Sequence, residues 1–316
     1  MPTWPRNMRK PPSCTFPKLS KVSWRRARGK GVSPSSLALC VWSGLSPHTA
    51  TLIFMRVGYY QNNPEFGKVA ENLERIAVAL ETTEADLLVL PELCATGYQF
   101  GSPDEVRGLA EPVPSGRTTK RLLDLAKHRQ MVIVAGLPEQ AGTASYNSAV
   151  VVGPQGFIGC YRKTHLFFEE TLLFTPGDTG FHVWDIGPAK IGVMICFDWY
   201  YPEAARTLAL KGADIICHPS NLVLPNCPDS MPVRCLENRV FAVTCNRTGS
   251  EARHGKDRLT YIGSSEIVSP RGAILHRAPR DQEALCVVEI DPVEARNKSV
   301  TPYNDLLRDR RESLYT

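Results

Sequence analysis

Short apolar runs alternate with longer amphipathic stretches from residue 55 onward. Residues 66–80 place apolar side chains at intervals of three and four, which predicts a helix that ends near residue 84. The next apolar run, residues 86–90, is short, continuous and closed by a proline, which is typical of a buried strand. Because this alternation continues to residue 290, the sequence predicts a layered α/β domain with a mixed sheet.

The other elements are predicted from the same two periods. Strands are expected at 55–61, 131–136, 147–152, 157–163, 181–186, 189–195, 213–217, 240–245, 262–268, 272–277 and 284–290. Helices are expected at 117–129, 201–211 and 231–240. The turn sequence GPQG at 153–156 predicts a hairpin between two of these strands.

The basic balance of the chain comes from its first 54 residues. The net charge is +5, from 37 Lys and Arg against 32 Asp and Glu. Residues 1–54 contain nine of the basic residues and no acid, so the remainder is slightly acidic and no nucleic-acid surface is predicted. This segment, rich in Pro, Ser and Arg, is interpreted as a disordered extension. A stretch upstream of a start at Met55, an organelle-targeting segment and a twin-arginine export signal remain alternatives.

Cysteine placement favours a reduced protein. The chain has ten cysteines, most of them in or beside apolar segments, and no CxxC pair. In a chain of this length, that pattern predicts reduced thiols and a cytoplasmic location. No run of 18 apolar residues is present, so no membrane span is expected. Since HExxH, GxGxxG and P-loop motifs are absent, we expect no metal and no organic cofactor.

Cys196 is the first candidate for chemistry. It follows the apolar run 189–195 and precedes a predicted helix that begins near Pro202. A side chain at such a strand-to-helix corner lies at the sheet edge, where open α/β sheets bind ligands. Nearby helix amides are expected to lower the pKa of the thiol. The alternative is that Cys196 is one more small buried hydrophobic residue.

Acidic and basic residues at other strand ends are candidate partners. Glu92 follows the proline that closes a buried strand, where desolvation would raise its pKa and make it a suitable general base. Lys163 ends another strand, where it could stabilise an oxyanion, and Glu170 follows seven residues later. His165 is interpreted as structural. Spacing alone does not establish that these residues converge.

Three blocks of the sequence resemble the signature blocks of the nitrilase superfamily, the carbon–nitrogen hydrolases. They read LLVLPELCATGY, YRKTHLFFEETLLFTPGD and IGVMICFDWYYPEAARTLALKGADIICHPSN, in the family's order within residues 55–316. The resemblance implies a four-layer α-β-β-α sandwich that forms a homodimer or a larger homo-oligomer. It also implies that the tail, residues 291–316, contributes to the subunit interface.

The resemblance implies a role for each candidate residue. Glu92, Lys163 and Cys196 match the family's catalytic triad, and Glu170 matches its second, positioning glutamate. Glu92 would deprotonate Cys196, which would form a thioester with the substrate. Lys163 and the backbone N–H of Phe197 would hold the oxyanion.

The residues after Cys196 indicate a branch of the family. The run Phe197-Asp198-Trp199 is more similar to amidase-type than to nitrilase-type members, and it lacks the basic residues with which carbamoylases bind a carboxylate. We therefore expect hydrolysis of a small amide to a carboxylic acid and ammonia. Tyr98 and Trp199 are candidate substrate-binding residues. A nitrile or an N-carbamoyl substrate, and a catalytically inactive scaffold, are the alternatives.

Overall fold

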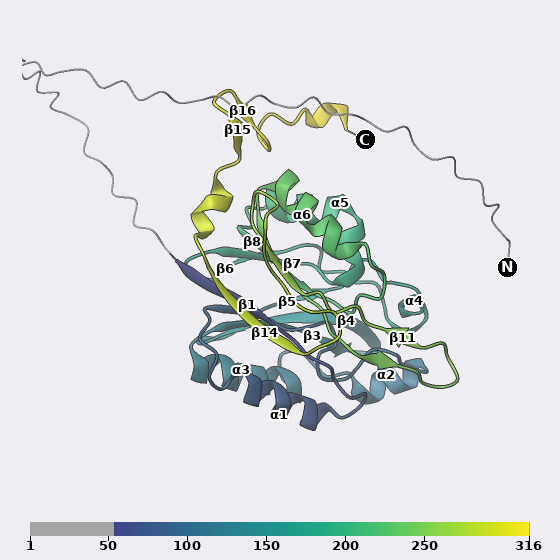
Figure 1. The fold of residues 1–316 in the computed structure, drawn as a ribbon. Helices are drawn as coiled ribbons and strands as arrows, with labels where there is room; N and C mark the ends of the chain where they lie inside the picture. Colours follow the sequence, from purple (N-terminus) through teal and green to yellow (C-terminus); the bar gives the residue numbers. More distant parts are fainter. Residues whose placement is uncertain (1–53, 316) are drawn as a thin grey trace, which may run out of the picture. The chain divides into compact units, whose positions relative to one another are not determined.

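Two six-stranded mixed sheets form the centre of the protein (Figure 1). The computed structural model describes residues 54–315. The first sheet contains, in spatial order, β14 (Ala284–Ile290), β1 (Met55–Gln61), β2 (Leu87–Val89), β3 (Val132–Ala141), β4 (Ala144–Gly153) and β5 (Gly156–Arg162). The second contains β13 (Ile274–Arg277), β12 (Glu266–Val268), β9 (Phe241–Cys245), β8 (Ile215–Pro219), β7 (Lys190–Val193) and β6 (Val183–Asp185).

The two sheets have the same pattern of strand directions. In each, three neighbouring strands are parallel: β1, β2 and β3 in the first sheet, and β7, β8 and β9 in the second. Each trio has one antiparallel strand at one side, which is β14 in the first sheet and β6 in the second. At the other side two further strands follow, β4 and β5 or β12 and β13, and each is antiparallel to the strand before it. Because the carboxyl ends of parallel strands meet at one edge, residues that follow these strands are brought together.

Helices cover the outer face of each sheet. In Figure 1, α1 (Val69–Leu80) and α3 (Arg117–Arg129) lie against the first sheet, and α5 (Pro202–Leu210) and α6 (Cys227–Asn238) against the second. The helices α2 (Pro103–Leu109) and α4 (Glu170–Leu173) are short. This arrangement confirms the predicted α-β-β-α sandwich.

The core follows from this layering, and the central strand β2 shows it because it is apolar and buried on both faces. Leu87 and Val89 of β2 belong to the cluster between the sheets, which continues under α5 and α6. Leu88, between them in sequence, packs with the apolar stripe of α1 and α3, including Leu73 and Leu122. Alternating side chains thus join β2 to two different layers.

Several element boundaries differ from the predictions. The helix expected at 231–240 begins at Cys227, with Pro228 in its first turn, where the missing N–H costs nothing. The strand expected at 262–268 covers only Glu266–Val268. The short helices α2 and α4 were not predicted, because a single turn or two has no measurable period. In residues 54–315 no helix is long and apolar enough to cross a membrane.

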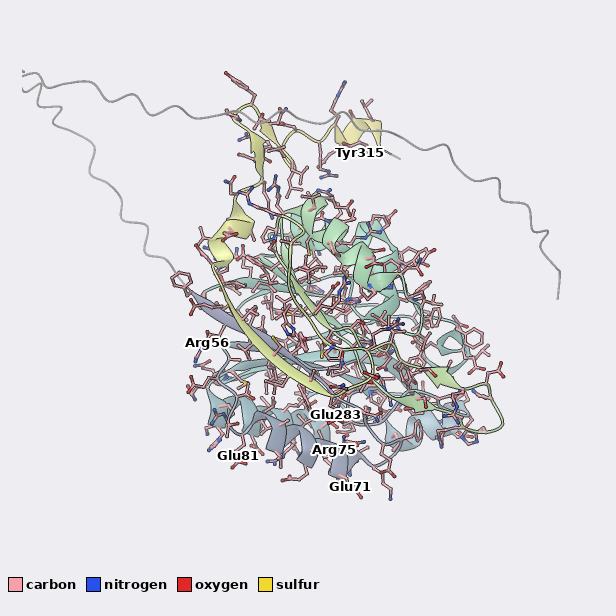
Figure 2. The ribbon with its side chains drawn as sticks, in the orientation of Figure 1. Arg56, Glu71, Arg75, Glu81, Glu283 and Tyr315 are labelled. Carbon is pink, nitrogen blue, oxygen red and sulfur yellow. The ribbon has the colours of Figure 1, made fainter. Side chains whose placement is uncertain are left out.

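The last long strand of the domain, β14, pairs with its first strand, β1. β14 pairs antiparallel with β1 over seven residues, from Met55 with Ile290 to Gln61 with Ala284. Beside this pair, Glu283 forms an ion pair with Arg75 of α1; both residues are labelled in Figure 2. The first sheet therefore includes both the first and the last long strand of the described chain.

The predicted extension, residues 1–54, lies outside the described residues except for Phe54. The tail after β14 has two 3₁₀ turns, η2 (Pro292–Arg296) and η3 (Glu312–Leu314), and a small hairpin of β15 (Ser299–Thr301) and β16 (Asn304–Asp305). Its Tyr303 is 91% exposed and its Leu314 is 64% exposed. A role for this tail in a subunit interface stays a prediction.

Removal of residues 1–54 is expected to leave a folded protein with full activity. The reason is that both six-stranded sheets are complete between Met55 and Ile290, and side chains of the described residues pack into core clusters with them. The test compares the melting temperature and specific activity of the full chain with those of a chain that starts at Met55. A large loss of soluble protein on truncation would contradict this domain boundary.

Candidate active site

A buried lysine and two buried carboxylates form the centre of the site. The Nζ of Lys163 donates to Oε1 of Glu92 at 2.7 Å and to Oε1 of Glu170 at 2.8 Å. The side chains of Lys163 and Glu92 are completely buried and that of Glu170 is 3% exposed. The structure therefore brings together three of the residues singled out from the sequence.

Each of these side chains is delivered by a different segment. Glu92 follows β2, where the glycine at position 136 of β3 lets the two backbones approach, since a Cβ there would lie 2.5 Å from the Cα of Glu92. Lys163 directly follows β5, whose pairing with β4 continues through the bond from its N–H to the carbonyl of Asn147, at 2.8 Å. Glu170 is the first residue of α4.

Both donors to Glu92 converge on the same oxygen. Oε1 receives Nζ of Lys163 and also Nδ2 of Asn147, at 2.7 Å. Oε2 is buried and has no hydrogen-bond partner among residues 54–315. Burial raises the pKa of Glu92 to about 7, although Lys163 opposes this shift. Glu92 therefore presents one free oxygen that can take up a proton near neutral pH.

The ammonium of Lys163 keeps its charge in this environment. Burial lowers the pKa of Lys163, but the carboxylates of Glu170 and Glu92 outweigh that effect and raise the pKa overall. A fixed positive charge in a site shielded from water stabilises a nearby anion more strongly than it would in solution.

Cys196 starts a 3₁₀ turn, η1 (Cys196–Tyr200), directly after the two-residue link that follows β7. Cys196 was predicted at the end of an extended strand. Its φ of +43° shows that its backbone is in the left-handed region instead. Such a backbone is strained for a residue with a side chain and is often found at functional positions.

The expectation of a lowered thiol pKa is wrong. Burial raises the pKa of Cys196 well above its usual value, and Glu92 raises it further, which shows that the two groups are close. Lys163 and the backbone N–H of Asn221 act in the opposite direction without compensating. The resting group is therefore a thiol, and a base is required to ionise it.

Two buried side chains hold the strained turn in place. Asp198 accepts from the N–H of Ile195 and the hydroxyl of Tyr161, both at 2.8 Å, and from Nδ1 of His165 at 2.7 Å. His218 lies 2.9 Å from the carbonyl oxygen of Cys196 through Nε2, and burial lowers its pKa to about 4. A neutral His218 can donate this bond, and His165 has the structural position expected of it.

The second carboxylate is fixed from three directions. Besides Lys163, Glu170 accepts from the hydroxyl of Tyr98 at 2.7 Å and from the N–H of Phe167 at 3.1 Å. Tyr98 therefore lies at the site, in contact with Glu170. Its role in substrate binding stays a prediction.

A small cavity opens beside Cys196. Its volume is about 20 Å³, roughly the space of one water molecule. Its lining residues carry no charge; they are Phe167, Cys196, Phe197, Trp199, Asn221, Leu222, Val223 and Leu224. The predicted substrate-binding residue Trp199 is thus at the cavity wall, and Phe197 is placed next to the thiol.

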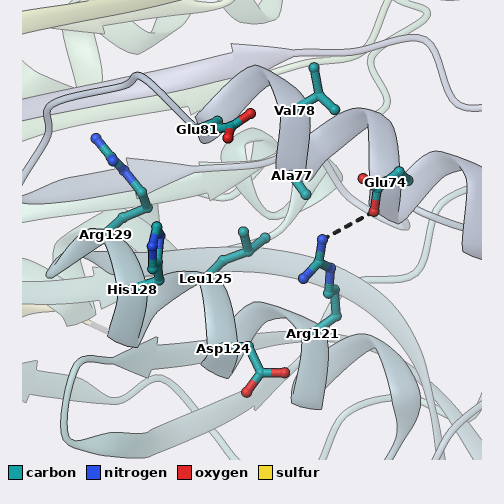
Figure 3. Close-up of a pocket in the computed structure, with 9 residues that line it drawn as sticks. All are labelled: Glu74, Ala77, Val78, Glu81, Arg121, Asp124, Leu125, His128 and Arg129. Carbon is teal, nitrogen blue, oxygen red and sulfur yellow. Dashed lines mark hydrogen bonds and ion pairs between the residues drawn. The ribbon is translucent and has the colours of Figure 1, made fainter.

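A larger cavity, of about 410 Å³, lies in the groove between α1 and α3 (Figure 3). Figure 3 shows charged side chains along both helices, with Arg121 bonded to Glu74 at 3.1 Å. This groove is on the outer helix layer, and the first sheet separates it from Cys196. Because none of the residues predicted to be catalytic lines it, it is not the candidate active site.

The fold is that of a carbon–nitrogen hydrolase, and the comparisons with known proteins agree. The sequence model of the carbon-nitrogen hydrolase family matches residues 56–298. The chain belongs to this family and is an enzyme that acts on carbon–nitrogen bonds.

Individual relatives support the assignment. A "Nitrilase" of Pyrococcus abyssi is 48% identical over 83% of this chain and 99% of its own length. An "(R)-stereoselective amidase" of Pseudomonas is 36% identical over 82% of this chain and 93% of its own length. The crystal structure of a carbon-nitrogen hydrolase from Helicobacter pylori has a TM-score of 0.76 and 30% identity, and covers 83% of this chain and 97% of that one.

Three residues at the site were not predicted from the sequence. Asn147 was seen only as the start of a strand, and His218 and Asn221 only as part of a quoted block. The available signal was their position, since polar residues at the ends of buried apolar strands are uncommon. What they contact could not be inferred without the fold.

Proposed function

We propose that the enzyme hydrolyses a small, uncharged amide to a carboxylic acid and ammonia through a thioester on Cys196. The observation that carries the proposal is the buried ion pair of Lys163 with Glu92, whose Oε2 has no hydrogen-bond partner among residues 54–315 and whose charge raises the pKa of the Cys196 thiol. A base, a nucleophile and a fixed cation are the parts that acyl transfer through a thiol requires.

In the first half of the reaction, Glu92 removes the proton of Cys196, and the sulfur attacks the amide carbonyl carbon. The carbonyl oxygen becomes an oxyanion, which Nζ of Lys163 and the backbone N–H of Phe197 stabilise. Glu92 then returns the proton to the amide nitrogen. The carbon–nitrogen bond breaks, ammonia leaves, and the acyl group remains on Cys196 as a thioester.

In the second half, water replaces ammonia at the same carbon. Glu92 removes a proton from the water, which attacks the thioester carbonyl, and the same cation and N–H hold the second oxyanion. Collapse of this intermediate breaks the carbon–sulfur bond, and Cys196 regains its proton from Glu92. Glu170 and Asn147 act as positioning residues, since each holds Lys163 or Glu92 in place.

The cavity supports an uncharged substrate. A carboxylate on the substrate would need a cation for recognition, and the lining of the cavity offers none. The carboxylate of Asp198 adds no negative charge to the lining of the cavity either, because it is buried and bonded to Tyr161 and His165. The uncharged lining therefore argues against an N-carbamoyl amino acid as the substrate, since that compound carries a carboxylate. A nitrile is the second candidate, favoured by the name of the Pyrococcus abyssi relative.

The test is ammonia release from a matched panel of substrates, with mass spectrometry of the enzyme during turnover. Aliphatic amides, the corresponding nitriles and N-carbamoyl amino acids are compared at equal concentration. We expect the largest kcat/KM for the amides and an acyl adduct on Cys196. Turnover confined to nitriles would replace the amide proposal, and no turnover of any compound would support an inactive scaffold.

The activity is expected to fall below about pH 7. The pKa of Glu92 is raised to about 7, so at lower pH its carboxyl group carries a proton and cannot accept one from Cys196. kcat/KM should therefore decrease up to about tenfold for each pH unit below that value. It is measured from about pH 5 to about pH 8, with the melting temperature as a control for unfolding. A profile that stays flat across this range would show that Glu92 is not the titrating base.

A further inference from the structure

Asn221 has a buried carboxamide without a partner. Its side chain is 3% exposed, and neither Oδ1 nor Nδ2 has a hydrogen-bond partner in residues 54–315. Within that part of the chain, it is the one asparagine whose carboxamide leaves both its oxygen and its nitrogen unpaired. Leaving polar groups in this state destabilises a protein, so the position calls for an explanation.

The carboxamide of Asn221 is not needed to fix the backbone of residues 220–222. The N–H of Ser220 donates to the carbonyl of Cys245, and the N–H of Leu222 donates to Oδ1 of Asn246, both at 2.8 Å. The carbonyl of Leu222 accepts from the N–H of Ile262 at 2.9 Å. The backbone on both sides of Asn221 is therefore fixed by other groups.

The topology places Asn221 beside the nucleophile. β8 ends at Pro219 and runs parallel to its neighbour β7, which leads to Cys196. The backbone N–H of Asn221 is close enough to lower the pKa of the Cys196 thiol, and both residues line the same cavity. In that cavity Asn221 accompanies aromatic and aliphatic side chains, including Phe197 and Leu224.

We propose that the carboxamide of Asn221 binds a hydroxyl group next to the scissile carbonyl of the substrate. The inference rests on the proposed function, in which the leaving nitrogen faces Glu92 and the oxyanion faces Lys163. The acyl group then occupies the remaining side of Cys196, where Asn221 lies. The preferred substrates are small 2-hydroxy amides.

A hydroxyl fits both atoms of the carboxamide. It donates one hydrogen bond, which Oδ1 of Asn221 accepts, and it accepts one, which Nδ2 donates. An ammonium group would leave Nδ2 unpaired, and a carboxylate would leave Oδ1 unpaired.

The test compares glycolamide with propionamide, which differ only in a hydroxyl against a methyl group. The wild-type enzyme should have a kcat/KM for glycolamide about 10- to 100-fold above that for propionamide. Asn221→Leu should remove this preference by lowering the value for glycolamide alone. Asn221→Asp, which keeps the acceptor and the shape, should lose only part of it. Asn238→Leu, at a buried asparagine of α6, is the matched control and should leave the ratio unchanged.

The outcomes separate this inference from the proposed function. Hydrolysis of both amides without a preference for glycolamide would overturn the role of Asn221 and leave the amidase proposal standing. An equal loss on both amides in Asn221→Leu and in Asn221→Asp would show a structural role, which also overturns it. Ammonia from neither amide in the wild-type enzyme would contradict the amidase proposal and this inference together.

Discussion

Cys196→Ala is expected to lower ammonia release at least about 10⁴-fold, because it removes the atom that forms the thioester. The folded structure should change little, since the substitution deletes a single sulfur atom at a side chain that is 5% exposed. The melting temperature should therefore stay within about 5 °C of the wild-type value. The measurements are steady-state ammonia release, thermal unfolding and intact mass in the presence of the amide.

A second cysteine provides the control for this substitution. Cys235 is completely buried in α6 and takes no part in the proposed reaction. Cys235→Ala should destabilise the protein to a similar degree and keep its activity and its acyl adduct. Turnover by Cys196→Ala within tenfold of the wild-type rate would rule out Cys196 as the nucleophile.

Lys163→Met is expected to abolish activity and also to destabilise the fold. The substitution leaves Glu92 and Glu170 buried without their shared cation. Loss of one partner from a buried ion pair costs about 3–5 kcal/mol in the free energy of unfolding, which lowers the melting temperature by about 10 °C in a domain of this size. The measurements are thermal unfolding and ammonia release at pH 8, where Glu92 of the wild-type enzyme is ionised.

A double variant distinguishes the two effects. If unpaired charge causes the instability, Lys163→Met combined with Glu170→Gln should recover part of the lost stability and none of the activity. Lys120→Met, at an exposed position of α3, is the control for removal of a lysine and should change neither property. Wild-type stability in Lys163→Met would contradict the buried ion-pair network.

The layers of the fold could be predicted because local patterns determine them. The helix at 117–129 was correct to the residue, since a run of apolar side chains at helical spacing is bounded by Gly116 and a left-handed Gln130. The pairing of β14 with β1 could not be predicted, because the two strands are far apart in sequence and no local signal records their contact.

In the site, too, the residue types could be predicted from the local sequence, whereas properties that depend on distant contacts could not. Glu92, Lys163, Glu170 and Cys196 were recognisable as polar residues in a family pattern, and the first three prove to be in direct contact. The thiol pKa was predicted in the wrong direction, because it depends on burial and on the neighbouring carboxylate, neither of which is visible in the sequence.

The pairing of β1 with β14 also bears on how the chain matures during synthesis. β1 leaves the ribosome early, yet its antiparallel neighbour is complete only at Ile290. Until then, one edge of β1 exposes unpaired N–H and C=O groups, which attract other strands. A nascent chain arrested before residue 284 would carry all the candidate catalytic side chains and still lack the strand that closes its first sheet. Such fragments should be recognised by chaperones or aggregate rather than accumulate as partly active enzyme.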